Sequence, residues 1–288
     1  MINYKQSKIV LVLGFFDGVH KGHRKVISEA VLYAKNNNAK TVLLTFPESP
    51  AIYFNSDFEY IFERQYNYDK IKTFGIDLIN ETPFEKLVNI GQAEYLKMIV
   101  EKYSPIAIFT GYNYTFGKNR EGNADTLKTF SSKYNYKYFD IAPIKDNNDV
   151  VSSTFIKKLL KQADLIRANN LLCDNFFIEG IVIEGQKLGR KLGFPTANIN
   201  YPPEIIKLPY GVYKAEVMDM PAVLNWGVKP TVNGIKPIVE VYIPNFNGDL
   251  YGKKLRVKFI KKIRDEIKFS SIEELKIQIK KDINKCLK

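Results

Sequence analysis

The apolar run KIVLVL at residues 8–13 constrains this chain most, because every residue after the lysine is hydrophobic. A strand with one solvated face alternates polar and apolar residues, whereas a strand covered on both faces is apolar throughout. The run therefore predicts an inner strand of a parallel sheet. A helix is predicted from about Gly22 to Asn36, and a second strand at residues 40–46, KTVLLTF.

The alternation of strand and helix continues to about residue 110. Apolar residues at helical spacing predict a helix over residues 84–103 that Pro105 stops. IAIF at residues 106–109 is a further strand, followed by a polar loop at residues 111–122. Strand, helix, strand in this order predict an α/β domain with a doubly wound parallel sheet. Open sheets of this kind bind ligands at the carboxyl ends of their strands.

The second half has a different pattern. Short runs of strand character, separated by turn signals such as NFNGD, predict a small antiparallel β-barrel or sheet. These runs are residues 176–185, 211–217, 237–243 and 254–263. A terminal helix should follow, with Ser270 and Glu273 as a capping box. We therefore expect two domains, residues 1–172 and residues 173–288.

Composition limits the class of protein. The chain has 288 residues and a net charge of +12. This charge suggests anionic partners, but it does not distinguish nucleotides from nucleic acid or membrane surfaces. Its two cysteines, Cys173 and Cys286, lie far apart and fit neither a disulfide framework nor a zinc motif. We expect a cytoplasmic protein with reduced thiols.

Both histidines of the chain, His20 and His23, lie in one glycine-rich turn after the first predicted strand. Free N–H groups and the dipole at a helix N-terminus favour phosphate there. Imidazoles three residues apart face the same way and can stabilise charge on phosphate oxygens. A zinc site with Asp17 is the alternative, but zinc normally takes more ligands than this turn offers.

The segment GFFDGVHKGH resembles the signature of the HxGH nucleotidyltransferase superfamily, which transfers a nucleotide from ATP to a phosphate acceptor. VSSTFIK at residues 151–157 resembles the second motif of that superfamily, ISSTxxR. GYNYTFGKNREG at residues 111–122 resembles a loop of the bifunctional riboflavin kinase/FAD synthetase family. GRKLGFPTANI at residues 189–199 resembles the kinase signature of the same family, and later segments follow in the family order, so the resemblance spans almost the whole chain.

The resemblance implies two reactions, with ATP, riboflavin and FMN as substrates and Mg²⁺ as the cation. It implies catalytic roles for His20, His23 and Glu240, and Mg²⁺ ligation by Thr196 and Asn198. It implies nucleotide and phosphate binding by Gly14, Phe16, Asp17, Gly22, Asn113, Ser153, Thr154, Lys157, Gly189, Arg190, Gly193 and Pro195. It implies flavin binding by Arg264 and Phe269. On the residues alone, Glu240 is better interpreted as a solvated outward residue of an alternating strand, and SST before a helix as only a cap.

Two departures concern the adenylylation domain. Lys157 stands where the motif has arginine, and lysine lacks the planar fork of a guanidinium. FPESP at residues 46–50 replaces a PHP-like segment of the family and carries no histidine.

One alternative is therefore a monofunctional riboflavin kinase whose first domain is inactive or only binds nucleotide. Another is a basic nucleic-acid-binding module, although no nucleic-acid-binding signature supports it. We expect no nucleic-acid or membrane partner and allow for weak or transient self-association.

Overall fold

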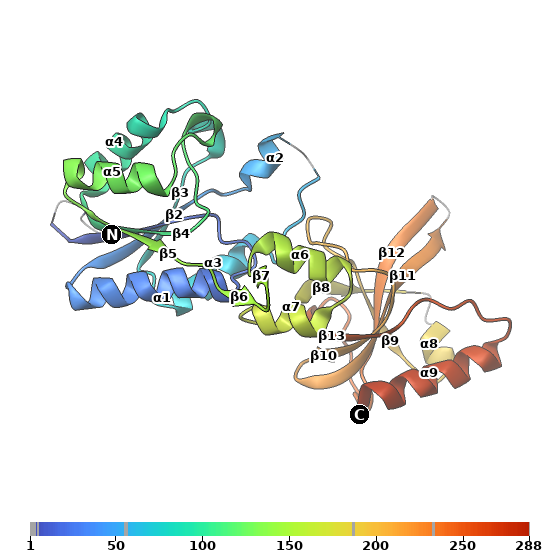
Figure 1. The fold of residues 1–288 in the computed structure, drawn as a ribbon. Helices are drawn as coiled ribbons and strands as arrows, with labels where there is room; N and C mark the ends of the chain where they lie inside the picture. Colours follow the sequence, from blue (N-terminus) through green and yellow to red (C-terminus); the bar gives the residue numbers. More distant parts are fainter. Residues whose placement is uncertain (1–3, 5, 55–56, 186–187, 232–233, 288) are drawn as a thin grey trace. The chain divides into compact units, whose positions relative to one another are not determined.

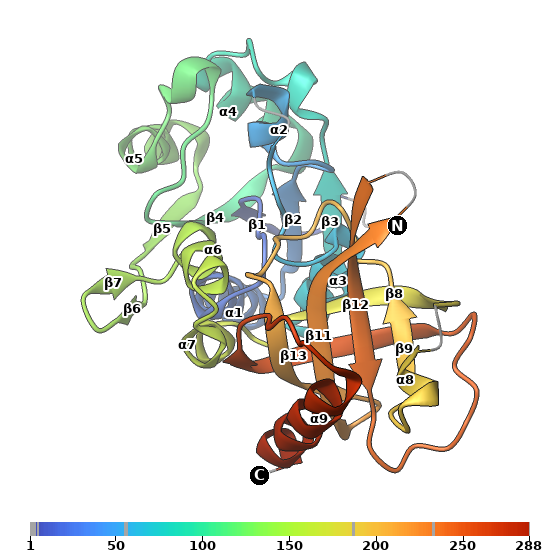
Figure 2. The ribbon, with the colours of Figure 1, turned by 90° about the vertical axis from the view of Figure 1, so that its right-hand side faces the viewer.

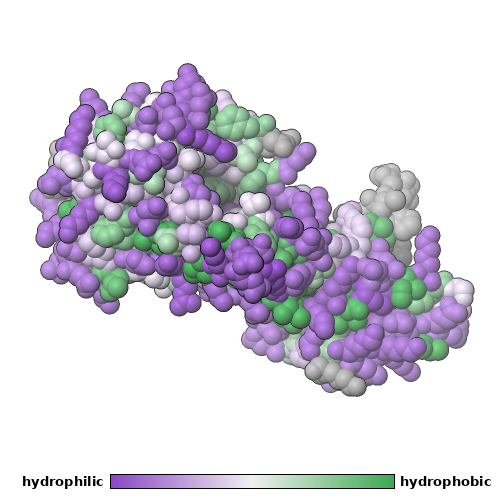
Figure 3. Space-filling model, in the orientation of Figure 1, coloured by the Kyte–Doolittle hydropathy of each residue, from purple (hydrophilic) through white to green (hydrophobic). Residues whose placement is uncertain are grey.

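The computed structural model describes residues 4, 6–54, 57–185, 188–231 and 234–287 (Figure 1). The chain folds into two compact units. The first consists of Met1–Phe58 and Glu63–Ser153, and the second of Glu59–Phe62 and Thr154–Lys288. On the face drawn in Figure 3, hydrophobic side chains lie in small groups among hydrophilic ones.

The first unit contains the predicted parallel sheet, with the strand order β3-β2-β1-β4-β5. Its strands are β1 (Ile9–Leu13), β2 (Lys40–Thr45), β3 (Leu78–Glu81), β4 (Pro105–Gly111) and β5 (Lys137–Ile141). Leu13, the last residue of β1, is in register with Leu44 on β2 and Thr110 on β4. The segments that follow these three strands therefore leave the sheet at one edge.

Helices cover both faces of this sheet, as Figure 1 shows, and the doubly wound fold is confirmed. Val10 and Val12 of β1 pack in the core formed with α1 and α3, whereas Leu11 and Leu13 pack on the opposite face, with α4 and α5. The helices of this unit are α1 (Lys21–Asn36), α2 (Pro50–Phe54), α3 (Arg64–Thr73), α4 (Gln92–Tyr103) and α5 (Ala124–Tyr134), with 3-10 turns η1 (Phe84–Lys86) and η2 (Lys118–Arg120). A short hairpin, β6 (Lys145–Asp146) and β7 (Asp149–Val150), follows. The apolar run thus forms an inner strand because both of its faces are covered by helices.

The helix predicted over residues 84–103 was wrong in its first part. The chain forms η1 and then an extended residue, Gly91, before α4 begins at Gln92. The break is stabilised by loop contacts: Glu121 accepts a hydrogen bond from the backbone N–H of Gln92, and the backbone N–H of Lys118 donates one to the carbonyl of Ile90. Apolar spacing continues through the break, which is why the pattern concealed it.

The second unit contains the predicted antiparallel barrel, closed in the order β10-β11-β12-β9-β8-β13. Its strands are β8 (Phe177–Ile183), β9 (Thr196–Ile199), β10 (Gly211–Val217), β11 (Met220–Thr231), β12 (Gly234–Tyr242) and β13 (Lys254–Arg264). The helices are α6 (Ser153–Lys161), α7 (Leu165–Leu171), α8 (Leu188–Lys191) and α9 (Ile272–Leu287). The sequence pattern did not predict β9 and β11 as strands.

Large side chains fill the barrel, among them the fully buried Trp226, Tyr213 and Phe259. The predicted terminal helix α9 lies beside the barrel strands (Figure 2). Its cap is one residue later than predicted, because the Ser271 hydroxyl accepts the backbone N–H of Glu274 at 3.2 Å. Ser270 instead donates to the Glu274 carboxylate.

Helices α6 and α7 belong to the second compact unit, apart from Ser153, the first residue of α6. The side chain of Asn169 links α7 to the second unit. It donates a hydrogen bond to the carbonyl of Phe259 and accepts one from the N–H of Phe176. The predicted limits of the two enzymatic domains, at residue 172, remain a prediction.

Candidate functional site

The histidine turn lies at the carboxyl end of β1, as predicted. His20 is the N-cap of α1, and its Nδ1 accepts the backbone N–H of His23 at 3.3 Å. The two imidazole rings stack, with centroids 3.6 Å apart and planes inclined by 20°. Phe16, with φ of 59°, and Gly18, with φ of 80°, occupy the left-handed region, so the turn is sharp.

Burial governs the electrostatics of this turn. His20 is 4% exposed, and burial lowers the pKa of His20 from 6.5 to about 4. Burial and the neighbouring His20 lower the pKa of His23 well below its ordinary value. Both rings are therefore neutral at pH 7. Because Nδ1 of His20 accepts a hydrogen bond, its proton lies on Nε2, where it can be donated to a ligand.

Ser153 connects the SST segment to the histidine turn within the first unit. Its hydroxyl donates to the backbone carbonyl of Asp17 at 2.8 Å. A side chain at Gly22 would lie 3.0 Å from the His20 ring and 3.4 Å from the carbonyl of Val151. Glycine at this position therefore allows His20 and the approach to the SST segment to pack closely.

The other residues predicted for this site have different surroundings. Phe16 is buried and packs edge-on against His23, with centroids 5.0 Å apart, so only its backbone is open to a phosphate role. A side chain at Gly14 would lie 2.8 Å from the Phe16 ring. Asn113 is exposed in the turn after β4. Thr154 and Lys157 lie on α6, in the second compact unit, and their roles at the histidine turn remain predictions.

A cavity of about 170 Å³ opens beside Gly14 at the same edge of the sheet. Its walls come from segments that follow β1, β2, β3 and β4, and from α4. Six of the lining residues are Gly14, Thr45, Phe46, Thr82, Tyr95 and Tyr114. Phe46 and Tyr114 belong to segments that the sequence singled out, residues 46–50 and residues 111–122, whereas Thr45, Thr82 and Tyr95 were not indicated as site residues.

In the barrel, the strand register brings three predicted site residues together. Glu240 on β12 lies directly opposite Asn198 on β9, and Tyr242 lies opposite Thr196. Directly opposed residues of antiparallel strands have neighbouring side chains on one face. Glu240 is half-buried, whereas its neighbours Val239 and Val241 are fully buried. The register thus places a carboxylate beside the two predicted cation ligands.

Glu240, Thr196 and Tyr242 border a cavity of about 410 Å³ between the barrel and α9. Ligand sites commonly have volumes of about 300 to 1,000 Å³. Five predicted site residues line it, namely Gly189, Thr196, Glu240, Arg264 and Phe269. Residues of α9 that the sequence pattern did not indicate, including Leu275 and Asp282, form the opposite wall.

Asn198 has the features of a cation ligand. It is 5% exposed, and among the described residues its Oδ1 has no hydrogen-bond partner. A side chain at Gly185 would lie 2.2 Å from Nδ2 of Asn198, so glycine is needed beside it. Side-chain oxygens of this kind suit Mg²⁺. The donor set therefore fits the implied cation, with Thr196 as the second oxygen.

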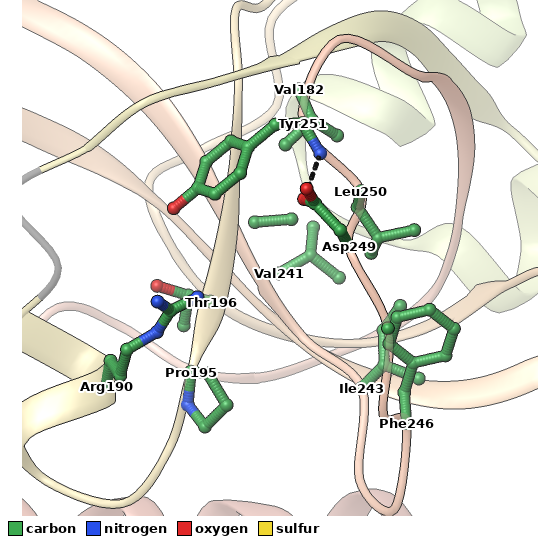
Figure 4. Close-up of a pocket in the computed structure, with 12 residues that line it drawn as sticks. Val182, Arg190, Pro195, Thr196, Val241, Ile243, Phe246, Asp249, Leu250 and Tyr251 are labelled. Carbon is green, nitrogen blue, oxygen red and sulfur yellow. Dashed lines mark hydrogen bonds between the residues drawn. The ribbon is translucent and has the colours of Figure 1, made fainter.

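Thr196 also borders a smaller hollow, which Figure 4 shows with Arg190, Pro195 and Thr196 on one side and Asp249 and Leu250 on the other. Asp249 accepts the backbone N–H of Tyr251 at 3.0 Å. Glycines shape the approach: Gly193 has φ of +87°, and a side chain at Gly189 would lie 2.4 Å from the carbonyl of Phe194. GQKLGRKLG at residues 185–193 is rich in glycine and basic residues, which predicts a flap over phosphates, but it includes residues 186–187, which lie outside the described residues.

Arg264, predicted to contact flavin, makes a buried ion pair. Its Nε and Nη2 donate to Oδ2 of Asp282 at 3.0 and 2.8 Å. Its guanidinium also lies 5.9 Å from the ring centroid of Phe269. Asp282 is 2% exposed and was not anticipated, because it lies on a helix whose sequence shows only an apolar stripe. Arg264 and Asp282 both line the larger cavity, so the ion pair forms part of its wall.

Within the described ranges, no group of three or more His, Cys, Asp or Glu residues could hold a metal ion. The described helices include none with the length and apolarity needed to cross a membrane.

Known proteins similar to this chain cover both of its halves. A family model described as riboflavin kinase matches residues 172–288, and one described as FAD synthetase matches residues 2–155. Three bacterial proteins named bifunctional riboflavin kinase/FMN adenylyltransferase are similar over almost the whole chain. The Buchnera aphidicola (Schizaphis graminum) protein is 36% identical over 96% of this chain and 92% of its own length. The corresponding values are 32%, 100% and 94% for Bacillus subtilis, and 30%, 96% and 91% for Escherichia coli.

A solved structure is also similar over the full length. It is a Streptococcus pneumoniae protein described as a macrolide-efflux protein, with a TM-score of 0.87 and 28% identity. The match covers 99% of this chain and 96% of that chain.

Proposed function

The chain belongs to the bifunctional riboflavin kinase/FMN adenylyltransferase family, and on that premise we propose that it converts riboflavin to FAD in two ATP-dependent steps. The barrel domain, residues 173–288, phosphorylates riboflavin to FMN. The parallel-sheet domain, residues 1–172, transfers AMP from a second ATP to FMN. A monofunctional kinase is not favoured, because both family models match this chain.

One observation carries the kinase proposal: Glu240, which lines the 410 Å³ cavity together with Thr196, lies directly opposite Asn198 on the neighbouring strand. Thr196 and Asn198 would hold Mg²⁺, which when bound neutralises charge on the nucleotide phosphates. Thr196 borders both hollows, so the phosphates of ATP would lie near it and riboflavin would enter the larger cavity.

Glu240 would orient the 5′-hydroxyl of riboflavin and accept its proton. The hydroxyl oxygen then bonds to the γ-phosphorus, the bond to the bridging oxygen breaks, and ADP leaves. Gly189, Arg190, Gly193 and Pro195 would surround the nucleotide, and Arg264 with Phe269 would border the flavin.

In the parallel-sheet domain, a phosphate oxygen of FMN would attack the α-phosphorus of ATP and release pyrophosphate. The FMN phosphate is already ionised at pH 7, so this step needs no strong base. Neutral His20 and His23 would act as hydrogen-bond donors to the charge that develops on the transferred phosphate. The cavity beside Gly14, with its aromatic lining, would receive the flavin ring.

Remaining predicted residues take supporting roles. Gly14, Phe16, Asp17 and Gly22 would present the turn to phosphate, and Asn113, Ser153, Thr154 and Lys157 would hold the phosphates of ATP. We also infer a cytoplasmic site of action, where ATP is available and where Cys173 and Cys286 would stay reduced.

A product assay tests this proposal. Purified protein is incubated with ATP, Mg²⁺ and either riboflavin or FMN, and the flavins are separated by chromatography. Formation of FMN and then FAD is expected. Formation of FMN alone would refute the adenylylation half and would mean that Lys157 and FPESP are incompatible with that reaction here.

A further inference from the structure

Arg64, which no sequence motif singled out, joins the segments that follow β1 and β2. Its Nη1 donates to the carbonyl of Phe15 at 3.0 Å, and its Nη2 donates to the carbonyl of Phe46 at 2.7 Å. The guanidinium also lies over the Phe15 ring, 4.2 Å from its centroid. A planar fork can bridge two carbonyls and stack on a ring at the same time, which an ammonium cannot.

The same network reaches the end of β3. Nη2 of Arg64 donates to the Tyr68 hydroxyl at 2.8 Å, and that hydroxyl donates to the carboxylate of Glu81, the last residue of β3. The guanidinium also faces the Tyr68 ring at 4.6 Å. One side chain at the start of α3 therefore connects the carboxyl ends of three parallel strands.

These anchored residues are chain neighbours of the adenylylation site. Phe15 lies between Gly14, which lines the cavity, and Phe16, which packs edge-on against His23. Phe46 lines the cavity itself and begins the divergent FPESP segment. Glu81 precedes Thr82, another lining residue. Movement of the anchored carbonyls would displace the cavity wall and the histidine turn together.

We infer that Arg64 is a positioning residue for FMN adenylylation, which fixes the histidine turn relative to the FPESP segment across the carboxyl edge of the sheet. The inference rests on the proposed adenylylation function. Arg64 acts through Phe15 and Phe46 and need not contact either substrate.

The test compares R64M, R64K and Y68F with the wild type. We expect R64M to lower kcat/KM for FMN adenylylation at least about tenfold, because a displacement of about 1 Å can cost about a hundredfold. R64K keeps the charge but not the fork and should fall between R64M and the wild type. Y68F removes the Tyr68 hydroxyl, which contacts Glu81, Nη2 of Arg64 and the carbonyl of Phe46, but it leaves the bonds from Arg64 to Phe15 and Phe46 in place. It should therefore lose less than R64M, about threefold. Riboflavin kinase turnover of the same samples should stay within about twofold.

Two measurements separate positioning from simple loss of stability. The imidazole NMR signals of His20 and His23 should shift in R64M at a temperature where the protein is fully folded. K72M, which removes an exposed charge from the same helix, should change neither these signals nor the turnover.

Each outcome decides the inference. R64M with wild-type adenylylation and unshifted imidazole signals would overturn it. If R64M does not fold, R64K and Y68F decide, and wild-type rates in both would overturn it as well. A wild-type enzyme that makes no FAD would instead refute the proposed function itself, before any variant is compared.

Discussion

His20 and His23 stack with their ring centroids 3.6 Å apart, an arrangement that two imidazolium ions would not tolerate. Burial lowers the pKa values of both imidazoles and keeps both rings neutral at pH 7. The turn is therefore suited to donating hydrogen bonds and unsuited to holding a permanent positive charge. This agrees with a reaction whose nucleophile, a phosphate, is already ionised.

Replacing both histidines with alanine should separate the two activities. We expect H20A/H23A to lower FMN adenylylation at least about a hundredfold, since one transition-state donor alone is worth about a hundredfold or more. Riboflavin phosphorylation by the same sample should be unchanged, because the barrel holds that site. The rates are compared by chromatography of the flavin products, and the kinase rate serves as the folding control. Adenylylation within about threefold of the wild type would contradict the proposed role.

The two imidazoles should titrate far below their ordinary pKa. We expect a midpoint near pH 4 for His20 and one well below 6.5 for His23. Proton NMR of the imidazoles between pH 3 and 8 measures both, and single substitutions assign them because the chain has two histidines. A midpoint near 6.5 for either ring would contradict the buried, stacked arrangement.

The same shift makes stability depend on pH. Between pH 6.5 and 4, the unfolded chain binds more protons at His20 than the folded chain does, so stability is full above this window and falls as the pH decreases through it. The pKa of His20 is about 4 in the folded chain and 6.5 in the unfolded chain, and this difference corresponds to about 3 kcal/mol of unfolding free energy.

Elements with a strong local pattern were predictable from the sequence, and features set by distant contacts were not. The fully apolar β1 and the glycine-rich turn after it identified the inner strand and the histidine site. By contrast, β9 has only four residues, TANI, and two of them are polar, so the alternation was too short to indicate a strand. Its register with β12, which places Asn198 opposite Glu240, is a tertiary property.

The missed site residues have a common physical cause. Arg64 and Asp282 each act through partners distant along the chain, namely Phe15 and Arg264, and no local spacing reveals such pairs. The break before Gln92 likewise depends on Glu121, which caps the N-terminus of α4 from the loop after β4. The resemblance to a family identified the motif residues. The residues that position them could be found only from the three-dimensional fold.

Replacing Glu240 with glutamine should remove the proton acceptor and keep the shape of the pocket. We expect E240Q to lower riboflavin phosphorylation about a hundredfold to ten-thousandfold. Adenylylation of added FMN should be unchanged. E216Q is a matched control, because Glu216 is a barrel carboxylate that pairs with Lys258 and lines neither hollow. Equal kinase rates in E240Q and E216Q would show that Glu240 is an ordinary strand residue.

Asn198 should set the Mg²⁺ requirement of the kinase. We expect N198A to raise the Mg²⁺ concentration for half-maximal riboflavin phosphorylation about tenfold or more, because a side-chain oxygen of the cation site is lost. N200A, at an exposed position directly after β9, is the control and should keep the wild-type requirement. Mg²⁺ titrations of FMN adenylylation should coincide for all three proteins. An unchanged kinase requirement in N198A would exclude Asn198 as a ligand.

Asp282 should stabilise the barrel through its ion pair with Arg264. Replacing one partner of a buried pair leaves the other charge uncompensated, which costs about 3 to 5 kcal/mol. We expect D282N to destabilise the barrel by about 3 kcal/mol. This is the lower end of that range, because the Arg264 side chain is still 16% exposed to solvent. The fluorescence of Trp226, the single tryptophan, follows unfolding of the barrel in denaturant.

The control for this measurement is D265N, which removes the carboxylate of the next residue in the chain after Arg264, one that is 87% exposed and pairs with Lys262. Its effect should be under about 0.5 kcal/mol, as for most surface substitutions. D282N should also raise the KM for riboflavin, since a guanidinium without its carboxylate partner would turn into the cavity that both residues line. If D282N and D265N have the same stability and the same KM, the ion pair neither holds α9 against the barrel nor orients Arg264 toward the flavin.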